Sequence, residues 1–219
     1  MTMTDLSKDV LKRIGELKII PVVSIENASD AGALGDALLS AGLPLAEVTF
    51  RTEAAAEAIR LLASRGNILV GAGTVLNVDT VKRAVDAGAK FIVSPGFNPK
   101  VVSYCVQQEI PITPGTCTPT DIEMALDHGV KVVKFFPSEA VGGLKTIKLL
   151  AGPYGMMRFI PTGGITVENL ESYLKFPPIL AVGGSWMVAK DLIAAKRFDQ
   201  ITQLTREAVE AAKRARPAQ

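Results

Sequence analysis

The chain has 219 residues, of which 48% are hydrophobic, and 24 Lys and Arg against 22 Asp and Glu give a net charge of +2. This length suits one domain with a substantial core, and the interspersed charges predict no nucleic-acid partner. No apolar run reaches the length of a membrane span, and the start MTMTDLSKDV lacks a signal-peptide pattern, so we expect a cytoplasmic protein with no membrane partner. A single histidine excludes multi-histidine zinc sites, and Cys105 and Cys117 are expected to be buried structural thiols.

The first predicted element is an amphipathic helix over residues 4–17, where Leu6, Val10 and Ile14 recur at helical spacing. Eight short apolar runs follow, and each precedes a helical segment. The runs span residues 19–25, 45–50, 68–73, 91–96, 110–115, 130–136, 158–164 and 179–186. The helical segments span residues 28–41, 53–65, 78–87, 98–108, 119–128, 144–150 and 166–174, and closing helices follow from residue 188.

Eight strand–helix units predict an α/β fold of the (β/α)8 TIM-barrel type. We expect residues 1–219 to form one domain, in which the helix of residues 1–17 covers one end, residues 19–186 hold the eight strands and residues 188–215 form the closing helices. An open doubly wound sheet is the alternative. The repeat count and the Gly, Pro, Ser or Thr at most strand ends favour the barrel, whose active-site loops lie at those ends.

Lys134 is the most unusual residue in these runs, because it lies inside the apolar strand VKVVKFF of residues 130–136. Strand alternation places it on the same face as Val132 and Phe136. A lysine desolvated among such neighbours favours its neutral form and can act as a nucleophilic amine. The alternative is a strand-end lysine whose ammonium reaches solvent.

Polar side chains also gather on the second and third runs. Glu47, Thr49 and Arg51 are spaced by two and therefore share one face, and Thr74 ends the segment GAGT. A carboxylate and a guanidinium in an apolar run indicate either a structural ion pair or a functional site.

Glycine pairs follow the last two runs, at Gly163 and Gly164 and at Gly183 and Gly184, with Ser185 next in the chain. Glycines let backbone N–H groups approach an anion closely, and in barrels these two loops commonly bind phosphate. Tight turns without a ligand are the alternative. A reactive lysine, a carboxylate, an arginine and a phosphate site together indicate Schiff-base chemistry on a phosphorylated keto compound.

Six motifs resemble the class I 2-keto-3-deoxy-6-phosphogluconate (KDPG) aldolases, which overlap with the 4-hydroxy-2-oxoglutarate aldolases. They are EVTFRT (47–52), GAGTVL (71–76), SPG (94–96), VKFFPSE (133–139), FIPTGGI (159–165) and GGSWMV (183–188). The resemblance implies a homotrimer of (β/α)8 barrels with no metal and no cofactor. It further implies cleavage of KDPG to pyruvate and D-glyceraldehyde 3-phosphate in the Entner–Doudoroff pathway, and extends to cleavage of 4-hydroxy-2-oxoglutarate to pyruvate and glyoxylate.

The resemblance also assigns roles to individual residues. Lys134 matches the Schiff-base lysine, and Glu47 matches the carboxylate that transfers protons. Arg51 and Thr74 match the groups that bind the substrate carboxylate. The pocket walls match Pro95, Phe136 and Thr162, and the phosphate site matches Gly163, Gly164, Gly184 and Ser185.

Two rival hypotheses remain. A phosphate-sugar isomerase or epimerase on the same barrel would use carboxylates or a metal and would not need the amine of Lys134. A noncatalytic phosphate-binding barrel would hold Glu47 and Arg51 only as a structural pair.

Overall fold

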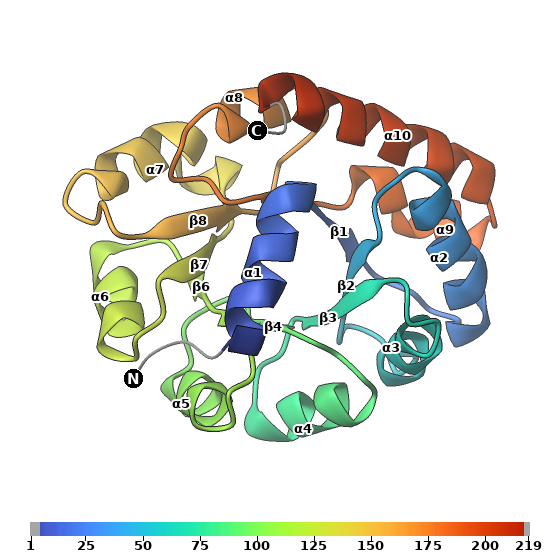
Figure 1. Cartoon of the computed structure of the whole chain (residues 1–219), viewed down its shortest axis with the longest axis horizontal. Helices are drawn as coiled ribbons and strands as arrows, with labels where there is room; N and C mark the ends of the chain where they lie inside the picture. Colours follow the sequence, from blue (N-terminus) through green and yellow to red (C-terminus); the bar gives the residue numbers. More distant parts are fainter. Residues whose placement is uncertain (1–4, 217–219) are drawn as a thin grey trace.

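The computed structural model describes residues 5–216, in which parallel strands alternate with helices (Figure 1). The strands are β1 (Ile19–Val23), β2 (Leu45–Thr49), β3 (Leu69–Gly73), β4 (Ile92–Val93), β5 (Ile112–Thr113), β6 (Gly115–Thr116), β7 (Val132–Phe135), β8 (Arg158–Pro161) and β9 (Val182–Gly184). The helices are α1 (Asp5–Leu17), α2 (Ala31–Ser40), α3 (Ala55–Ala63), α4 (Val78–Asp86), α5 (Pro99–Gln107), α6 (Pro119–Asp127), α7 (Gly143–Ala151), α8 (Leu170–Leu174), α9 (Lys190–Ala194) and α10 (Phe198–Ala215). Residues 1–4 of the predicted N-terminal helix lie outside the described residues.

The described residues also form three short 3-10 helices: η1 (Ala28–Asp30), η2 (Glu139–Val141) and η3 (Trp186–Val188). Several helices begin where a polar side chain accepts a backbone N–H, as Asn77 does from Thr80 at α4 and Asn98 does from Lys100 at α5. The helix expected over residues 166–174 begins only at Leu170, and the side chain of Asn169 folds back to accept the N–H of Thr166. Within the described residues, no helix has the length and apolar character needed to cross a bilayer.

The strands form two parallel sheets, and this differs from the predicted set of eight strands. One sheet has the order β5-β4-β3-β2-β1-β9 and the other β6-β7-β8. The predicted fifth strand is divided at Pro114 into β5 and β6, which belong to different sheets, because proline has no N–H to donate to a strand ladder. Isolated bridges join Phe159 of β8 to Ile179, in the segment before β9, and Thr162, just after β8, to Gly183 of β9. The α/β class with parallel strands is confirmed.

Side chains alternate between two apolar clusters on the two faces of the strands. In β2, Leu45 belongs to the smaller cluster, whereas Ala46 and Val48 belong to the larger one. In β7, Val132 belongs to the smaller cluster and Val133 to the larger one. Strand periodicity therefore directs Glu47 and Lys134 toward the face of the smaller cluster.

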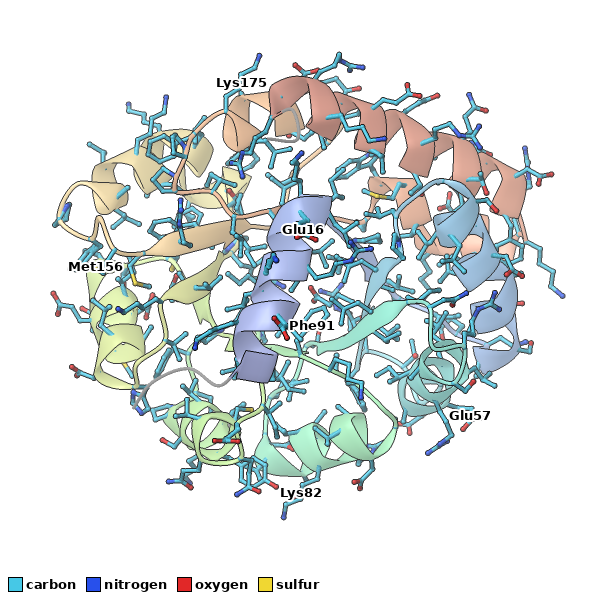
Figure 2. All side chains as sticks on the ribbon, in the orientation of Figure 1. Glu16, Glu57, Lys82, Phe91, Met156 and Lys175 are labelled. Atoms are coloured by element: carbon cyan, nitrogen blue, oxygen red, sulfur yellow. The ribbon has the colours of Figure 1, made fainter. Side chains whose placement is uncertain are left out.

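Helix α1 closes one side of the smaller cluster. Its Val10 and Ile14 pack there with Phe91, and α1 lies across the middle of the view while α2 to α10 surround the strands (Figure 1). Phe91 lies near the centre beside α1, whereas Glu57, Lys82 and Lys175 project outward (Figure 2). The ring of Phe91 occupies the space where a side chain at Gly71 would begin, so both positions are fixed by packing.

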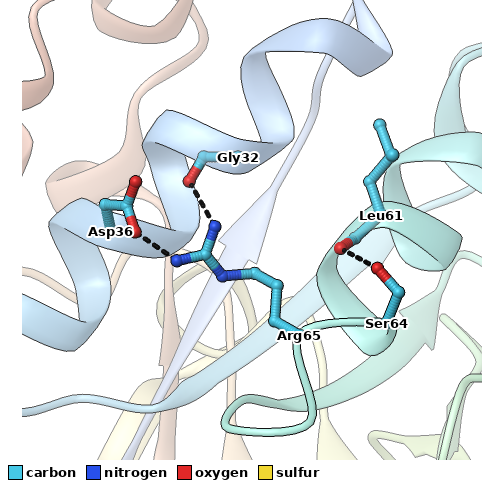
Figure 3. Close-up of polar contacts among 5 residues, drawn as sticks. All are labelled: Gly32, Asp36, Leu61, Ser64 and Arg65. Carbon is cyan, nitrogen blue, oxygen red and sulfur yellow. Dashed lines mark hydrogen bonds and ion pairs between the residues drawn. The ribbon is translucent and has the colours of Figure 1, made fainter.

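Arg65 joins two neighbouring helical units at the periphery (Figure 3). Its guanidinium donates to the carbonyl oxygen of Gly32 at 3.3 Å and pairs with the carboxylate of Asp36, both on α2. One residue earlier, the Ser64 hydroxyl donates to the carbonyl oxygen of Leu61 at 2.9 Å. The turn after α3 is therefore held in place before the chain enters β3.

Replacing Phe91 by Ala is expected to lower the free energy of unfolding by about 3–5 kcal/mol, because a fully buried ring is lost and a cavity remains. Phe91 is 1% exposed. Chemical denaturation measures the change. The control is Leu76→Ala, since Leu76 is 56% exposed and its loss is expected to change the stability by about 0.5 kcal/mol or less. Equal effects of the two substitutions would contradict the assignment of Phe91 to the core.

Candidate active site

Lys134 and Glu47 form a buried pair between the two sheets. Lys134 lies on β7 and Glu47 on β2, they are 4% and 2% exposed, and Lys134 Nζ is 3.7 Å from Glu47 Oε1. Lys134 Nζ also lies 5.1 Å from the ring centroid of Phe136. Within the described residues, Glu47 Oε1 has no hydrogen-bond partner. The pair therefore offers an amine and, beside it, a carboxylate oxygen that is free to exchange a proton.

Backbone contacts hold both side chains in place. The N–H of Lys134 donates to the carbonyl oxygen of Pro114 at 2.9 Å, and the Thr116 hydroxyl donates to the carbonyl oxygen of Lys134 at 3.2 Å. Glu47 lies directly over Gly73 on β3, where a Cβ atom would collide with its carboxylate. A glycine at position 73 is thus a condition for the observed orientation of Glu47.

Arg51 and Thr74 lie beyond the ends of β2 and β3 and contact each other. Arg51 Nε donates to Thr74 Oγ1 at 3.2 Å. Thr74 has a φ of 56°, which is strained for a β-branched residue and is often found at functional sites. Within the described residues, the other N–H groups of the guanidinium have no hydrogen-bond partner, so they could bind a planar anion such as a carboxylate.

A cavity of about 520 Å³ lies beside this group. Its lining includes Arg51, Phe136, Thr162, Gly163, Gly164, Gly184 and Ser185, together with Val22, Ser24, Thr49 and Lys190. Arg51 and Lys190 contribute positive charge, although Lys190 Nζ also pairs with Glu26 Oε1 at 2.6 Å, and no Asp or Glu is found among the lining residues. The cavity therefore suits an anionic ligand.

The loop after β8 lines this cavity with Thr162, Gly163 and Gly164. The carbonyl oxygens of Thr162 and Gly163 accept the N–H groups of Ser138 at 2.8 Å and Glu139 at 3.0 Å, and the Gly164 carbonyl accepts Asn169 Nδ2 at 2.9 Å. In a trans peptide the N–H points opposite to the C=O, so the N–H groups of residues 163–165 are turned away from these donors. None of the hydrogen bonds among the described residues uses these three N–H groups. Gly163 and Gly164, with φ values of 97° and 78°, adopt backbone conformations that favour glycine.

The second glycine pair, Gly183 and Gly184, also contains a position that only glycine can occupy. At Gly184 a Cβ atom would collide with the indole of Trp186, and Ser185 is exposed beside the cavity. The two loops predicted to bind phosphate thus line one cavity.

Four predicted site residues are not part of the cavity lining: Lys134, Glu47, Thr74 and Pro95. The carbonyl of Pro95 packs against Gly115, which is the register partner of Lys134. Ser24 and Lys190 line the cavity but were missed in the sequence. Ser24 directly follows a strand, as the predicted polar site residues do, so its position could have identified it. Lys190 lies beyond the last strand at the start of a closing helix, where no sequence pattern indicates a site residue.

The two cysteines are free thiols, and neither is poised as a thiolate. Cys105 is buried as predicted, and burial raises its pKa to about 12. Cys117 is only half-buried; burial and then the charge of Asp121 raise its pKa. Asp121 accepts the N–H groups of Cys117 and Thr118, and with Thr118 it forms a capping box at the start of α6. The described residues contain no group of three or more His, Cys, Asp or Glu that would hold a metal ion.

Fold and site together define a class: a parallel α/β protein in which a buried lysine–carboxylate pair lies beside a glycine-rich cavity without lining carboxylates. Comparison with known proteins gives the family. Residues 10–204 match the family described as KDPG and KHG aldolase. The chain is therefore a member of the KDPG and KHG aldolase family.

Three relatives illustrate the match. The 2-dehydro-3-deoxy-phosphogluconate aldolase of Haemophilus influenzae is 48% identical, over 95% of this chain and 99% of the relative. The crystal structure of the Legionella pneumophila KDPG aldolase, with pyruvate captured at low pH as a covalent carbinolamine intermediate, superposes with a TM-score of 0.88 at 35% identity, over 91% of this chain and 97% of the other. The Zymomonas mobilis 2-keto-3-deoxy-6-phosphogluconate aldolase with 3-phosphoglycerate has a TM-score of 0.85 at 39% identity, over 95% and 96% of the two chains.

Replacing Gly73 by Ala is expected to lower the kcat/KM of aldol cleavage by about 100-fold, because the new Cβ displaces the Glu47 carboxylate by an ångström or more. A coupled assay for pyruvate measures the rate. Gly32→Ala is the matched control, since a Cβ at Gly32 meets nothing within 4 Å. A Gly73→Ala enzyme that is folded and fully active would contradict the role given to the position of Glu47.

Proposed function

We propose that the protein is an aldehyde-lyase that cleaves KDPG to pyruvate and D-glyceraldehyde 3-phosphate through a Schiff base on Lys134. The observation that carries this proposal is the buried pair of Lys134 Nζ and Glu47 Oε1, 3.7 Å apart beside a cavity with no lining carboxylate. Membership of the family favours cleavage over the isomerase, epimerase and noncatalytic hypotheses.

The chemistry follows from the two groups of the pair. The neutral amine of Lys134 adds to the C2 carbonyl of the substrate and gives a carbinolamine, which loses water to form a protonated imine. Glu47 takes the proton of the C4 hydroxyl, the C3–C4 bond breaks, and its electron pair moves into the iminium to give an enamine. Glyceraldehyde 3-phosphate leaves; the enamine gains a proton at C3, and hydrolysis releases pyruvate and the free lysine.

The rest of the site accounts for the two anionic ends of the substrate. Arg51 and Thr74 bind the carboxylate next to C2, and Phe136 and Thr162 form the wall beside the imine, with Pro95 one strand away. Gly163, Gly164, Gly184 and Ser185 bind the phosphate through backbone N–H groups and a hydroxyl. The Legionella structure with a pyruvate carbinolamine and the Zymomonas structure with a phosphorylated acid support this arrangement.

A second substrate is 4-hydroxy-2-oxoglutarate, since the matched family covers both aldolase names. It carries the same keto acid end, and its cleavage to pyruvate and glyoxylate uses the same bond changes. It has no phosphate, and its other end is a second carboxylate, so it does not make the phosphate contacts proposed for the glycine loops.

We also propose that the two sheets are parts of one closed eight-stranded barrel in one domain. Pro114 joins β5 to β6, and Phe159 N and O bond to Pro178 O and Leu180 N, each at 2.9 Å, which links β8 to the segment before β9. β9 in turn pairs with β1. The assembly into a homotrimer and the cytoplasmic location are part of the same proposal; light scattering on the purified protein tests the trimer.

The first test is reduction with borohydride in the presence of pyruvate, followed by peptide mass spectrometry. We expect a pyruvyl adduct on Lys134, because the imine is reduced to a stable secondary amine. Lys134→Ala is expected to give no adduct and no cleavage, and Lys148→Ala, at a surface lysine of α7, is the control with normal trapping. A folded protein that gives no adduct with excess pyruvate refutes the Schiff-base mechanism and returns the isomerase to consideration.

Arg51→Lys is expected to raise the KM for KDPG by about tenfold, because an ammonium cannot hold a carboxylate through two parallel hydrogen bonds. Steady-state kinetics measure KM and kcat. Arg60→Lys serves as the control, since Arg60 pairs with Glu57 at the surface of α3. An unchanged KM in the Arg51 variant would show that this residue does not bind the substrate carboxylate.

A further inference from the structure

Tyr173 of α8 is a buried polar residue that has no part in the chemistry above. It is 1% exposed, and its hydroxyl donates to the carboxylate of Glu139 and lies 3.0 Å from Ser138 Oγ. The contact needs a glycine at position 143, because a Cβ there would lie 2.6 Å from the Tyr173 hydroxyl and 2.7 Å from Glu139 Oε1. The hydroxyl thus ties α8 to the segment that follows β7.

That segment directly supports the loop of residues 162–165, called the glycine loop below. The N–H groups of Ser138 and Glu139 hold the carbonyl oxygens of Thr162 and Gly163, as described above. The stem of Glu139 also packs against Gly164, where a Cβ would lie 2.6 Å from the Cβ and Cγ of Glu139. The position of residues 138 and 139 therefore determines which way the peptide groups of the glycine loop point.

Glu139 needs an anchor to have this effect. It is an exposed residue with a long side chain, and such side chains move among several rotamers unless a partner holds them. Tyr173 is a suitable partner because burial, and then its hydrogen bond with Glu139, raise its pKa to about 12. It remains a neutral hydroxyl donor throughout the neutral pH range.

We propose that Tyr173 is a positioning residue for phosphate recognition: through Glu139 it fixes the orientation of the N–H groups of the loop of residues 162–165, and so sets the preference for phosphorylated substrates. Tyr173 acts through the loop and does not contact the substrate. The inference rests on the proposed function, since it assigns a phosphate to this loop.

The test compares a phosphorylated ligand with a phosphate-free one in Tyr173→Phe, which keeps the ring and removes only the hydroxyl. We expect the KM for KDPG to rise about tenfold while kcat changes by less than about threefold. The rate of borohydride-trapped pyruvate adduct on Lys134, which involves no phosphate, is expected to stay within about twofold. Tyr154→Phe is the matched control, because Tyr154 also donates to a glutamate, Glu123, at 2.8 Å but at the surface and away from the loop.

A conservative variant adds a second criterion. Glu139→Gln keeps an oxygen that accepts from Tyr173 and is expected to retain the KM for KDPG, whereas Glu139→Ala is expected to reproduce the effect of Tyr173→Phe. An equal loss with KDPG and with pyruvate would show that Tyr173 has only a general structural role and would overturn the proposal. An unchanged KM in Tyr173→Phe would overturn it as well.

Calorimetric binding of glycerol 3-phosphate separates this proposal from the proposed function. If the wild-type protein forms no pyruvate adduct, the aldolase mechanism fails, but weaker binding of glycerol 3-phosphate by Tyr173→Phe than by Tyr154→Phe still supports the positioning role. If the adduct forms and both variants bind glycerol 3-phosphate equally, the aldolase mechanism stands and the positioning role is refuted.

Discussion

The contact on which the site depends is the one between Lys134 and Glu47, two charge-bearing side chains buried among apolar neighbours. Taking such groups out of water is unfavourable, and removing one partner of a buried pair typically costs about 3–5 kcal/mol because the other is left uncompensated. A pair of this kind adds little net stability. It does provide an amine and a carboxylate at fixed positions, which is what imine formation and proton transfer require.

One short segment of chain connects this pair to the loop of residues 162–165, which we propose binds phosphate. Lys134 lies on β7, and four and five residues later the N–H groups of Ser138 and Glu139 hold the carbonyl oxygens of the glycine loop. The separation between the buried amine and the proposed phosphate site is therefore set by the end of a single strand. Arg51 and Thr74, the proposed carboxylate-binding pair, are placed in a similar way, at the ends of β2 and β3.

Much of the arrangement follows from local patterns. The alternation of apolar runs and helical segments located the strands to within a few residues, because buried parallel strands are apolar on both faces. The pattern could not show that the run of residues 110–115 is divided between two sheets. Proline lacks an N–H, but whether this interrupts a strand depends on whether a neighbouring strand would have accepted a hydrogen bond from it. The shortened helix α8 has a similar cause, because Asn169 uses its side chain to hold the loop before the helix.

The sequence by itself determined the parallel α/β class, the faces on which Lys134 and Glu47 lie, and the glycines of the two loops, because strand periodicity and backbone freedom are local properties. The resemblance of its motifs gave the family and the expected roles. Only the tertiary structure decided that Glu47 stands 3.7 Å from Lys134, that Lys190 and Ser24 line the cavity, and that Tyr173 reaches Glu139 behind the glycine loop. These contacts join residues from different strands and helices, 87 positions apart in the case of Glu47 and Lys134, so no periodicity within one segment could place them.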